Sequence, residues 1–109
     1  MANSLFVYGT LGPGRPNAHI LEDLGGEWTE AFVIGKLVEA GWGAKSGYPA
    51  LVIDETGEQI DGFLFTSNKL PDNWPMLDAF EGAEYERVTI KVHLSDGATA
   101  MAQVYSLKP

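Results

Sequence analysis

The chain has 109 residues, 45% of them hydrophobic and 20% charged, which fits a single domain over residues 1–109 with one buried core. Fifteen acidic residues against seven Lys and Arg give a net charge of −8, and this charge disfavours nucleic acid and anionic membranes as partners. The absence of cysteine excludes disulfides, thiol nucleophiles, iron–sulfur clusters and thiolate zinc sites.

The N-terminal segment does not have the features of a targeting sequence. It lacks a basic region, and its apolar run stops after Tyr8, unlike the longer apolar core of a signal peptide. No stretch approaches the roughly 18 apolar residues of a membrane-spanning helix. We therefore expect a soluble protein of the cytoplasm.

The first quarter of the chain predicts a strand, a loop and a short helix. The strand covers Leu5–Tyr8 and ends at Gly9. Glycines and prolines over residues 9–16 predict a loop, after which Asn17 is placed to cap a helix. The apolar face of this helix consists of Ile20, Leu21 and Leu24.

Three more strands are predicted before a second helix. They cover Glu27–Val38, Ala50–Ile53 and Ile60–Thr66, with a loop over residues 40–48 between the first two. Gly62 lies inside the third of these strands. A glycine there indicates either a bulge or a close approach of two backbones.

The last third of the chain predicts a helix followed by a hairpin. The helix ends at Gly82, and the residues that suit its first turn are Pro71, Asp72, Asn73 and Pro75. Residues of Val88–Leu94 alternate between apolar and polar, and Asp96-Gly97 turns the chain into Thr99–Leu107. This pattern is typical of an antiparallel hairpin.

The order of the elements predicts an α+β fold. Successive strands without an intervening helix pair mostly antiparallel. A small sheet hides its edges most economically by curling towards a barrel. We therefore expect a small mixed, mostly antiparallel β-barrel with flanking short helices.

Metal and nucleotide sites are disfavoured. His19 and His93 stand alone, without metal-ligand spacing, and both are expected to face solvent. The glycine-rich loop over residues 9–16 lacks the Lys-Ser/Thr pair of a phosphate-binding P-loop. Successive backbone N–H groups at 9–12 could still bind an oxyanion or a carboxylate, and the same residues could equally form an ordinary turn.

One of the fifteen carboxylates has unusual surroundings. Glu81 lies at the C-terminal end of the predicted helix, where the helix dipole disfavours an acid, and it is close in sequence to Phe80 and Tyr85. Aromatic neighbours and a negative dipole end raise a carboxyl pKa, and such a group suits general acid–base catalysis. The alternative interpretation is a frayed helix end with Glu81 in water.

Several motifs occur in order along nearly the whole chain: residues 5–11 (LFVYGTL), 48–51 (YPAL), 62–65 (GFLF), 77–82 (LDAFEG) and 85–87 (YER). Together they resemble the γ-glutamylcyclotransferase-like family, to which the avirulence-induced plant proteins and the γ-glutamylamine cyclotransferases belong. The resemblance implies a small mixed barrel and a reaction that releases 5-oxoproline and a free amine or amino acid. It implies no cofactor.

The resemblance also assigns roles to individual residues. Glu81 is implied as the acid–base carboxylate. The residues implied to bind the γ-glutamyl part of a small-molecule substrate are Tyr8, Gly9, Thr10 and Leu11. A non-catalytic module that binds a small ligand in the same pocket is the alternative function, since it would keep both the loop and the acid. Formation of a homodimer is left open.

Overall fold

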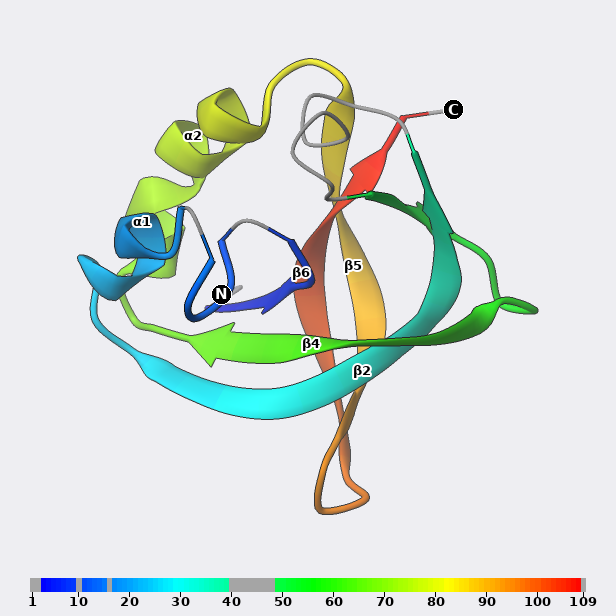
Figure 1. Cartoon of the computed structure of the whole chain (residues 1–109). Helices are drawn as coiled ribbons and strands as arrows, with labels where there is room; N and C mark the ends of the chain where they lie inside the picture. The colour runs from blue at the N-terminus through cyan, green and yellow to red at the C-terminus, as the bar shows by residue number, and fades with distance from the viewer. Residues whose placement is uncertain (1–2, 10, 16, 40–48, 109) are drawn as a thin grey trace.

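A computed structural model of the chain, which describes residues 3–9, 11–15, 17–39 and 49–108, forms a closed β-barrel (Figure 1). Five strands form the ring in the order β2-β4-β1-β6-β5, because β5 pairs back with β2, and β3 pairs with β2. The β1–β6 pair is parallel and the other pairs are antiparallel. The predicted mixed, mostly antiparallel barrel is therefore confirmed. The strands are β1 (Ser4–Val7), β2 (Glu27–Val38), β3 (Ala50–Ile53), β4 (Glu58–Thr66), β5 (Tyr85–Leu94) and β6 (Thr99–Leu107).

Side chains of successive residues in β1 pack into two different parts of the core, as the pleat of a strand requires. Phe6 belongs to the cluster inside the barrel, which includes Val33 and Leu64. Leu5 and Val7 belong to a second cluster, formed with residues of the helices on the outer face of the sheet. β1 is therefore buried on both faces.

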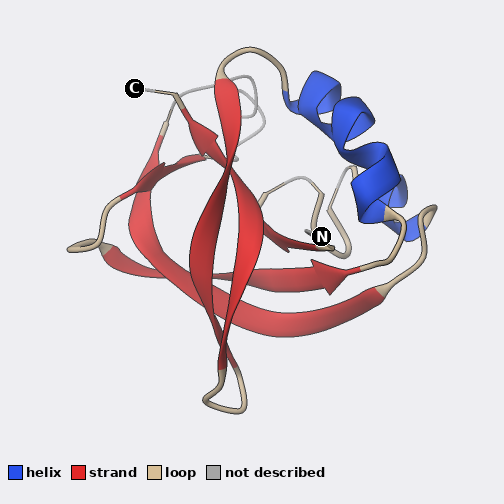
Figure 2. Cartoon of the chain, turned by 180° about the vertical axis from the view of Figure 1, so that it is seen from behind, coloured by secondary structure: helices blue, strands red, loops and turns tan. Residues whose placement is uncertain are grey.

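The two helices lie on the same side of the barrel (Figure 1 and Figure 2), and residues of both belong to the second core cluster. α1 (His19–Glu22) is a single turn, whereas α2 (Leu70–Glu81) runs for three turns. The buried residues of α2 are Leu70, Trp74 and Leu77, a spacing that places them on one face. This face completes the second core cluster.

The structure corrects two predictions about helix starts. Asn17 does not cap α1: Ala18 occupies the N-cap position, no side chain caps it, and Asn17 instead accepts a hydrogen bond on its backbone oxygen from Ile20 N–H (3.1 Å). Pro75 lies inside α2 rather than in its first turn, because α2 begins at Leu70. In both helices, the packing of buried residues further along the helix decides the first residue, and the capping preference of the local sequence does not.

The predicted hairpin is confirmed, and β5 begins three residues earlier than expected, at Tyr85. Val88 pairs with Val104, and Gly97 adopts a φ of 90° in the connecting turn. Asp96 stabilises this turn because its Oδ1 accepts a hydrogen bond from Ala98 N–H (2.9 Å). The hairpin extends well beyond the ring of strands (Figure 1).

Gly62 marks a close approach of backbones rather than a bulge. The pairing of β2 with β4 continues without interruption through Ala31 and Gly62. A Cβ atom on residue 62 would collide with the carbonyl oxygen of Val7 and with the ring of Phe6. Glycine is therefore required at this position of β4, beside the end of its antiparallel neighbour β1.

Candidate active site

Glu81 is held at the last turn of α2 with its side chain partly buried. It follows Leu77 by four residues, so its side chain extends the buried face of the helix. Burial raises the pKa of the Glu81 carboxyl to about 7. The expected rise in pKa is confirmed, and burial is its cause.

Three tyrosines lie within electrostatic range of this carboxylate. The negative charge of Glu81 contributes to raising the pKa of Tyr8, of Tyr85 and of Tyr105, although burial is the largest cause for each of the three phenols. Tyr8 directly follows β1, Glu81 is the last residue of α2, and Tyr105 lies two residues before the end of β6. The fold thus brings Glu81 close to the first residue of the predicted binding loop.

The hydroxyl of Tyr8 is bound to the backbone of two other segments. It donates a hydrogen bond to the carbonyl oxygen of Tyr105 (2.7 Å) and accepts one from Leu51 N–H (3.0 Å). Burial raises the pKa of this phenol well above its usual value. Because its only proton is already donated, Tyr8 is suited to holding the loop in place rather than to transferring protons.

The loop after Tyr8 is a run of consecutive turns. Gly12 N–H donates to Gly9 O (3.1 Å), and Arg15 N–H donates to Gly12 O (3.0 Å). The Gly12 amide is therefore used within the loop, in agreement with the interpretation of residues 9–12 as an ordinary turn. Leu11 is buried in the second core cluster and anchors the loop, whereas Thr10 lies outside the described residues.

A cavity of about 400 Å³ lies beside this loop. Its lining includes Tyr8 and Gly9 together with residues of β2 and β4, among them Glu30 and Asp61. Neither Leu11 nor Glu81 is among its lining residues. Of the four predicted site residues that the structure describes, Tyr8 and Gly9 line this cavity, and Leu11 and Glu81 do not.

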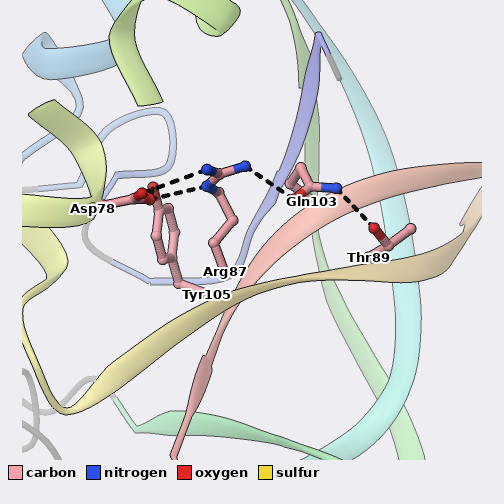
Figure 3. Close-up of polar contacts among 5 residues, drawn as sticks. All are labelled: Asp78, Arg87, Thr89, Gln103 and Tyr105. Atoms are coloured by element: carbon pink, nitrogen blue, oxygen red, sulfur yellow. Dashed lines mark hydrogen bonds and ion pairs between the residues drawn. The ribbon is translucent and has the colours of Figure 1, made fainter. Parts of the chain in front are cut away.

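A network of polar side chains extends from Asp78, near the end of α2, across β5 and β6, and it was not predicted from the sequence (Figure 3). Asp78 accepts hydrogen bonds from Tyr105 Oη (2.7 Å) and Arg87 Nε (2.9 Å). The hydrogen bond from Arg87 is the main cause that lowers the pKa of the Asp78 carboxyl. Tyr105 was missed because it is one aromatic residue in an alternating strand, which no motif distinguishes.

The two histidines differ in their surroundings. His19 is exposed, as expected, but His93 is half-buried and stacks on Phe32 with ring centroids 4.7 Å apart. Within the described residues, no three His, Asp or Glu side chains gather in a way that could hold a metal ion. The described helices are also all too short or too polar to cross a membrane.

Comparison with known proteins identifies the family. Residues 5–109 match the model of the family described as gamma-glutamyl cyclotransferase, AIG2-like. No curated protein is similar enough in sequence to match.

Solved structures with similar folds include YkqA from Bacillus subtilis, with 28% identity and a TM-score of 0.76 over 99% of this chain. The alignment covers only 36% of YkqA, so this chain spans about a third of that protein. An AIG2-like protein from Mus musculus has 24% identity and a TM-score of 0.74, over 96% of this chain and 76% of its own. An Arabidopsis thaliana protein has 21% identity and a TM-score of 0.70, over 98% and 62% of the two chains. Because the family model matches nearly the whole length of this chain, the chain belongs to the gamma-glutamyl cyclotransferase, AIG2-like family.

Proposed function

We propose that this protein is a γ-glutamyl cyclotransferase that releases 5-oxoproline and a free amine or amino acid, with Glu81 as its general acid and base. The observation that carries the proposal is the partly buried Glu81 carboxyl, whose pKa of about 7 suits proton transfer near neutral pH. Its charge acts on Tyr8, the first residue of the proposed binding loop. Membership of the family supports the reaction class.

The proposed reaction needs no covalent intermediate with the protein. The α-amine of the substrate attacks its own γ-carbonyl carbon, so a new C–N bond closes a five-membered ring while the original amide C–N bond breaks. Glu81 accepts the proton that the α-ammonium group must lose and returns it to the departing amine. Nucleophile and electrophile are already joined, so the protein has mainly to hold the substrate folded.

The remaining site residues are proposed to bind rather than to react. Tyr8 fixes the start of the loop through its bonds to Tyr105 O and Leu51 N–H. We assign the γ-glutamyl group to the loop residues Gly9, Thr10 and Leu11. Backbone N–H groups there would hold the α-carboxylate or the developing oxyanion.

Asp78 is a weaker candidate for the base. Its carboxylate is paired with Arg87 Nε at 2.9 Å and its pKa is lowered, so it stays ionised and accepts protons poorly near neutral pH. Burial instead raises the pKa of the Glu81 carboxyl to about 7, so this group exchanges a proton near neutral pH. Two carboxylates on one turn of helix therefore have opposite pKa shifts.

The test is formation of 5-oxoproline from a panel of γ-glutamyl amino acids and γ-glutamyl alkylamines. We expect product from the wild-type protein and a loss of turnover of roughly 10²–10⁴-fold in Glu81→Gln. Glu84→Gln is the matched control, because Glu84 is exposed and lies beyond the end of α2. Equal turnover in Glu81→Gln and wild type would remove Glu81 from the mechanism.

Binding measurements with the same panel test the alternative function. Tight binding of a γ-glutamyl compound without any 5-oxoproline would identify a non-catalytic ligand-binding module. Isothermal titration calorimetry on wild type and Glu81→Gln separates the two functions. For an enzyme, the variant should bind substrate and fail to convert it.

A further inference from the structure

Tyr105 contacts both of the segments that carry the proposed site. Its backbone carbonyl oxygen accepts the hydrogen bond of Tyr8 Oη at 2.7 Å. Its own hydroxyl donates to Asp78 Oδ1, also at 2.7 Å. Tyr105 is buried on β6, a strand of the closed ring. One residue of the barrel therefore binds the end of β1 through its backbone and the last turn of α2 through its side chain.

Asp78 is in turn held by Arg87 of β5, whose own side chain is fixed on several sides (Figure 3). Arg87 reaches both carboxylate oxygens, with Nε at 2.9 Å from Oδ1 and Nη2 at 3.4 Å from Oδ2. Its guanidinium carbon lies 4.5 Å from the ring centre of Trp74. Nη1 donates to Gln103 Oε1 (3.2 Å), and Gln103 Nε2 donates to Thr89 Oγ1 (2.8 Å).

This arrangement contributes more to geometry than to stability. The Asp78 side chain is 45% exposed, and an ion pair this open to water stabilises a fold only slightly. A planar guanidinium held by Trp74 and Gln103, however, offers its donors in a fixed orientation. The network therefore defines where the Asp78 carboxylate can lie.

The position of Asp78 determines that of Glu81. The two residues are three apart on α2, within one turn. Asp78 O also accepts the last hydrogen bond of the helix, from Gly82 N–H (3.1 Å). Helix ends fray readily, so a network at Asp78 secures the turn that carries Glu81.

We propose that Tyr105 is a positioning residue that fixes Glu81 relative to Tyr8 by binding both of their segments, with Arg87 holding Asp78 in place for it. The proposal rests on the function assigned above to Glu81. A misplacement of a reacting group by about 1 Å costs about 10²-fold in rate. The network would thus act on turnover without touching the substrate.

Tyr105→Phe tests the proposal because it removes only the hydroxyl and keeps the ring and the backbone carbonyl that binds Tyr8. We expect kcat for 5-oxoproline formation to fall by about 10–100-fold, with a smaller change in KM. The midpoint of the pH profile of kcat/KM should fall below its wild-type value near 7, because a loosened Glu81 becomes more hydrated.

Ser67→Ala is the matched control. Ser67 Oγ is also buried, donates one hydrogen bond to Gly25 O (2.7 Å), and lies just before the opposite end of α2. This control should lower the melting temperature without moving the pH midpoint. If Tyr105→Phe behaves in the same way, with wild-type kcat and midpoint, Tyr105 is only structural and the proposal is wrong.

Two further measurements keep the test decisive. Arg87→Lys keeps the positive charge but cannot make the paired contact with Asp78, so it should reproduce the loss if Tyr105→Phe does not fold. ¹³C NMR titration of the Glu81 carboxyl needs no turnover. If the wild type forms no 5-oxoproline, that result counts against the proposed function alone. A lowered Glu81 pKa in Tyr105→Phe would then still support the positioning role of Tyr105. An unchanged Glu81 pKa would overturn the positioning role.

Discussion

Glu81 lies one helical turn beyond Leu77 on the same face of α2, so an ionisable group follows fully buried apolar side chains towards the core. The same helical spacing that seats α2 on the barrel also removes part of the water from the carboxyl. Its raised pKa therefore has a structural cause that can be altered one residue at a time.

The stability of the fold should depend on pH through Glu81. Between about pH 4.5 and 7 the folded chain keeps a proton that the unfolded chain has released. The free energy of unfolding therefore falls as pH rises through this window and levels off above it. Glu81→Gln removes this dependence, so the variant should be more stable than wild type above pH 7.

Urea denaturation at several pH values from 4 to 8 measures the effect, with Glu84→Gln as control. The expected result is a slope present in wild type and in Glu84→Gln, and reduced in Glu81→Gln. Parallel curves for all three proteins would mean that Glu81 is solvated in the folded state.

The rate of cyclisation should rise with pH around neutrality. A general base acts in its ionised form, so kcat/KM should increase through a midpoint near the Glu81 pKa of about 7. The residual activity of Glu81→Gln should not show this increase of kcat/KM with pH. Initial rates of 5-oxoproline formation across pH 5.5–8.5 provide the measurement, and a midpoint that persists in the variant would assign the titration to another group.

Gly62→Ala should destabilise the barrel by about 1–3 kcal/mol or more, because overpacking in a closed core forces backbone shifts. The added Cβ would meet Val7 O and the Phe6 ring. Gly9→Ala is the steric control, since a Cβ there meets no atom within 4 Å. Thermal unfolding of the two variants should show a large loss for the first and a small change for the second; similar losses would contradict the close approach.

Leu77→Ala should cost about 2–5 kcal/mol through the cavity it leaves beneath α2. Leu77 is completely buried, whereas its neighbour Met76 is 42% exposed. Met76→Ala should change the free energy of unfolding by no more than about 0.5 kcal/mol. Chemical denaturation of this adjacent pair checks which face of α2 packs on the barrel, and reversed magnitudes would contradict the orientation seen here.

Much of the fold could be predicted because local patterns and tertiary packing agree. The limits of β2, the Asp96-Gly97 turn and the end of α2 at Gly82 all follow from residues close in sequence. The prediction of Asn17 as the cap of α1 was wrong because α1 is a single turn, and the burial of Leu21 decides where this turn lies. The parallel pairing of β1 with β6 has no local signal at all.

The site was predictable only in part for the same reason. Glu81 breaks a local rule by standing at a negative helix end, and such a departure is visible in a sequence. The partners of Asp78 come from two other strands, at Arg87 and Tyr105. Arg87 and Tyr105 are directly opposite each other in the β5–β6 hairpin. The packing of α2 that brings Asp78 to this pair has no local signal in the sequence.

Closure of the ring also has a consequence for how the chain is made. β1 is translated first, yet Leu5 pairs with Gln103, almost the full length of the chain away. Contacts so distant in sequence form slowly, and a nascent chain releases its segments in order from the N-terminus. The burial of β1 is therefore complete only after β6 has been made, and until then Leu5, Phe6 and Val7 lack part of the apolar cover that they have in the folded chain.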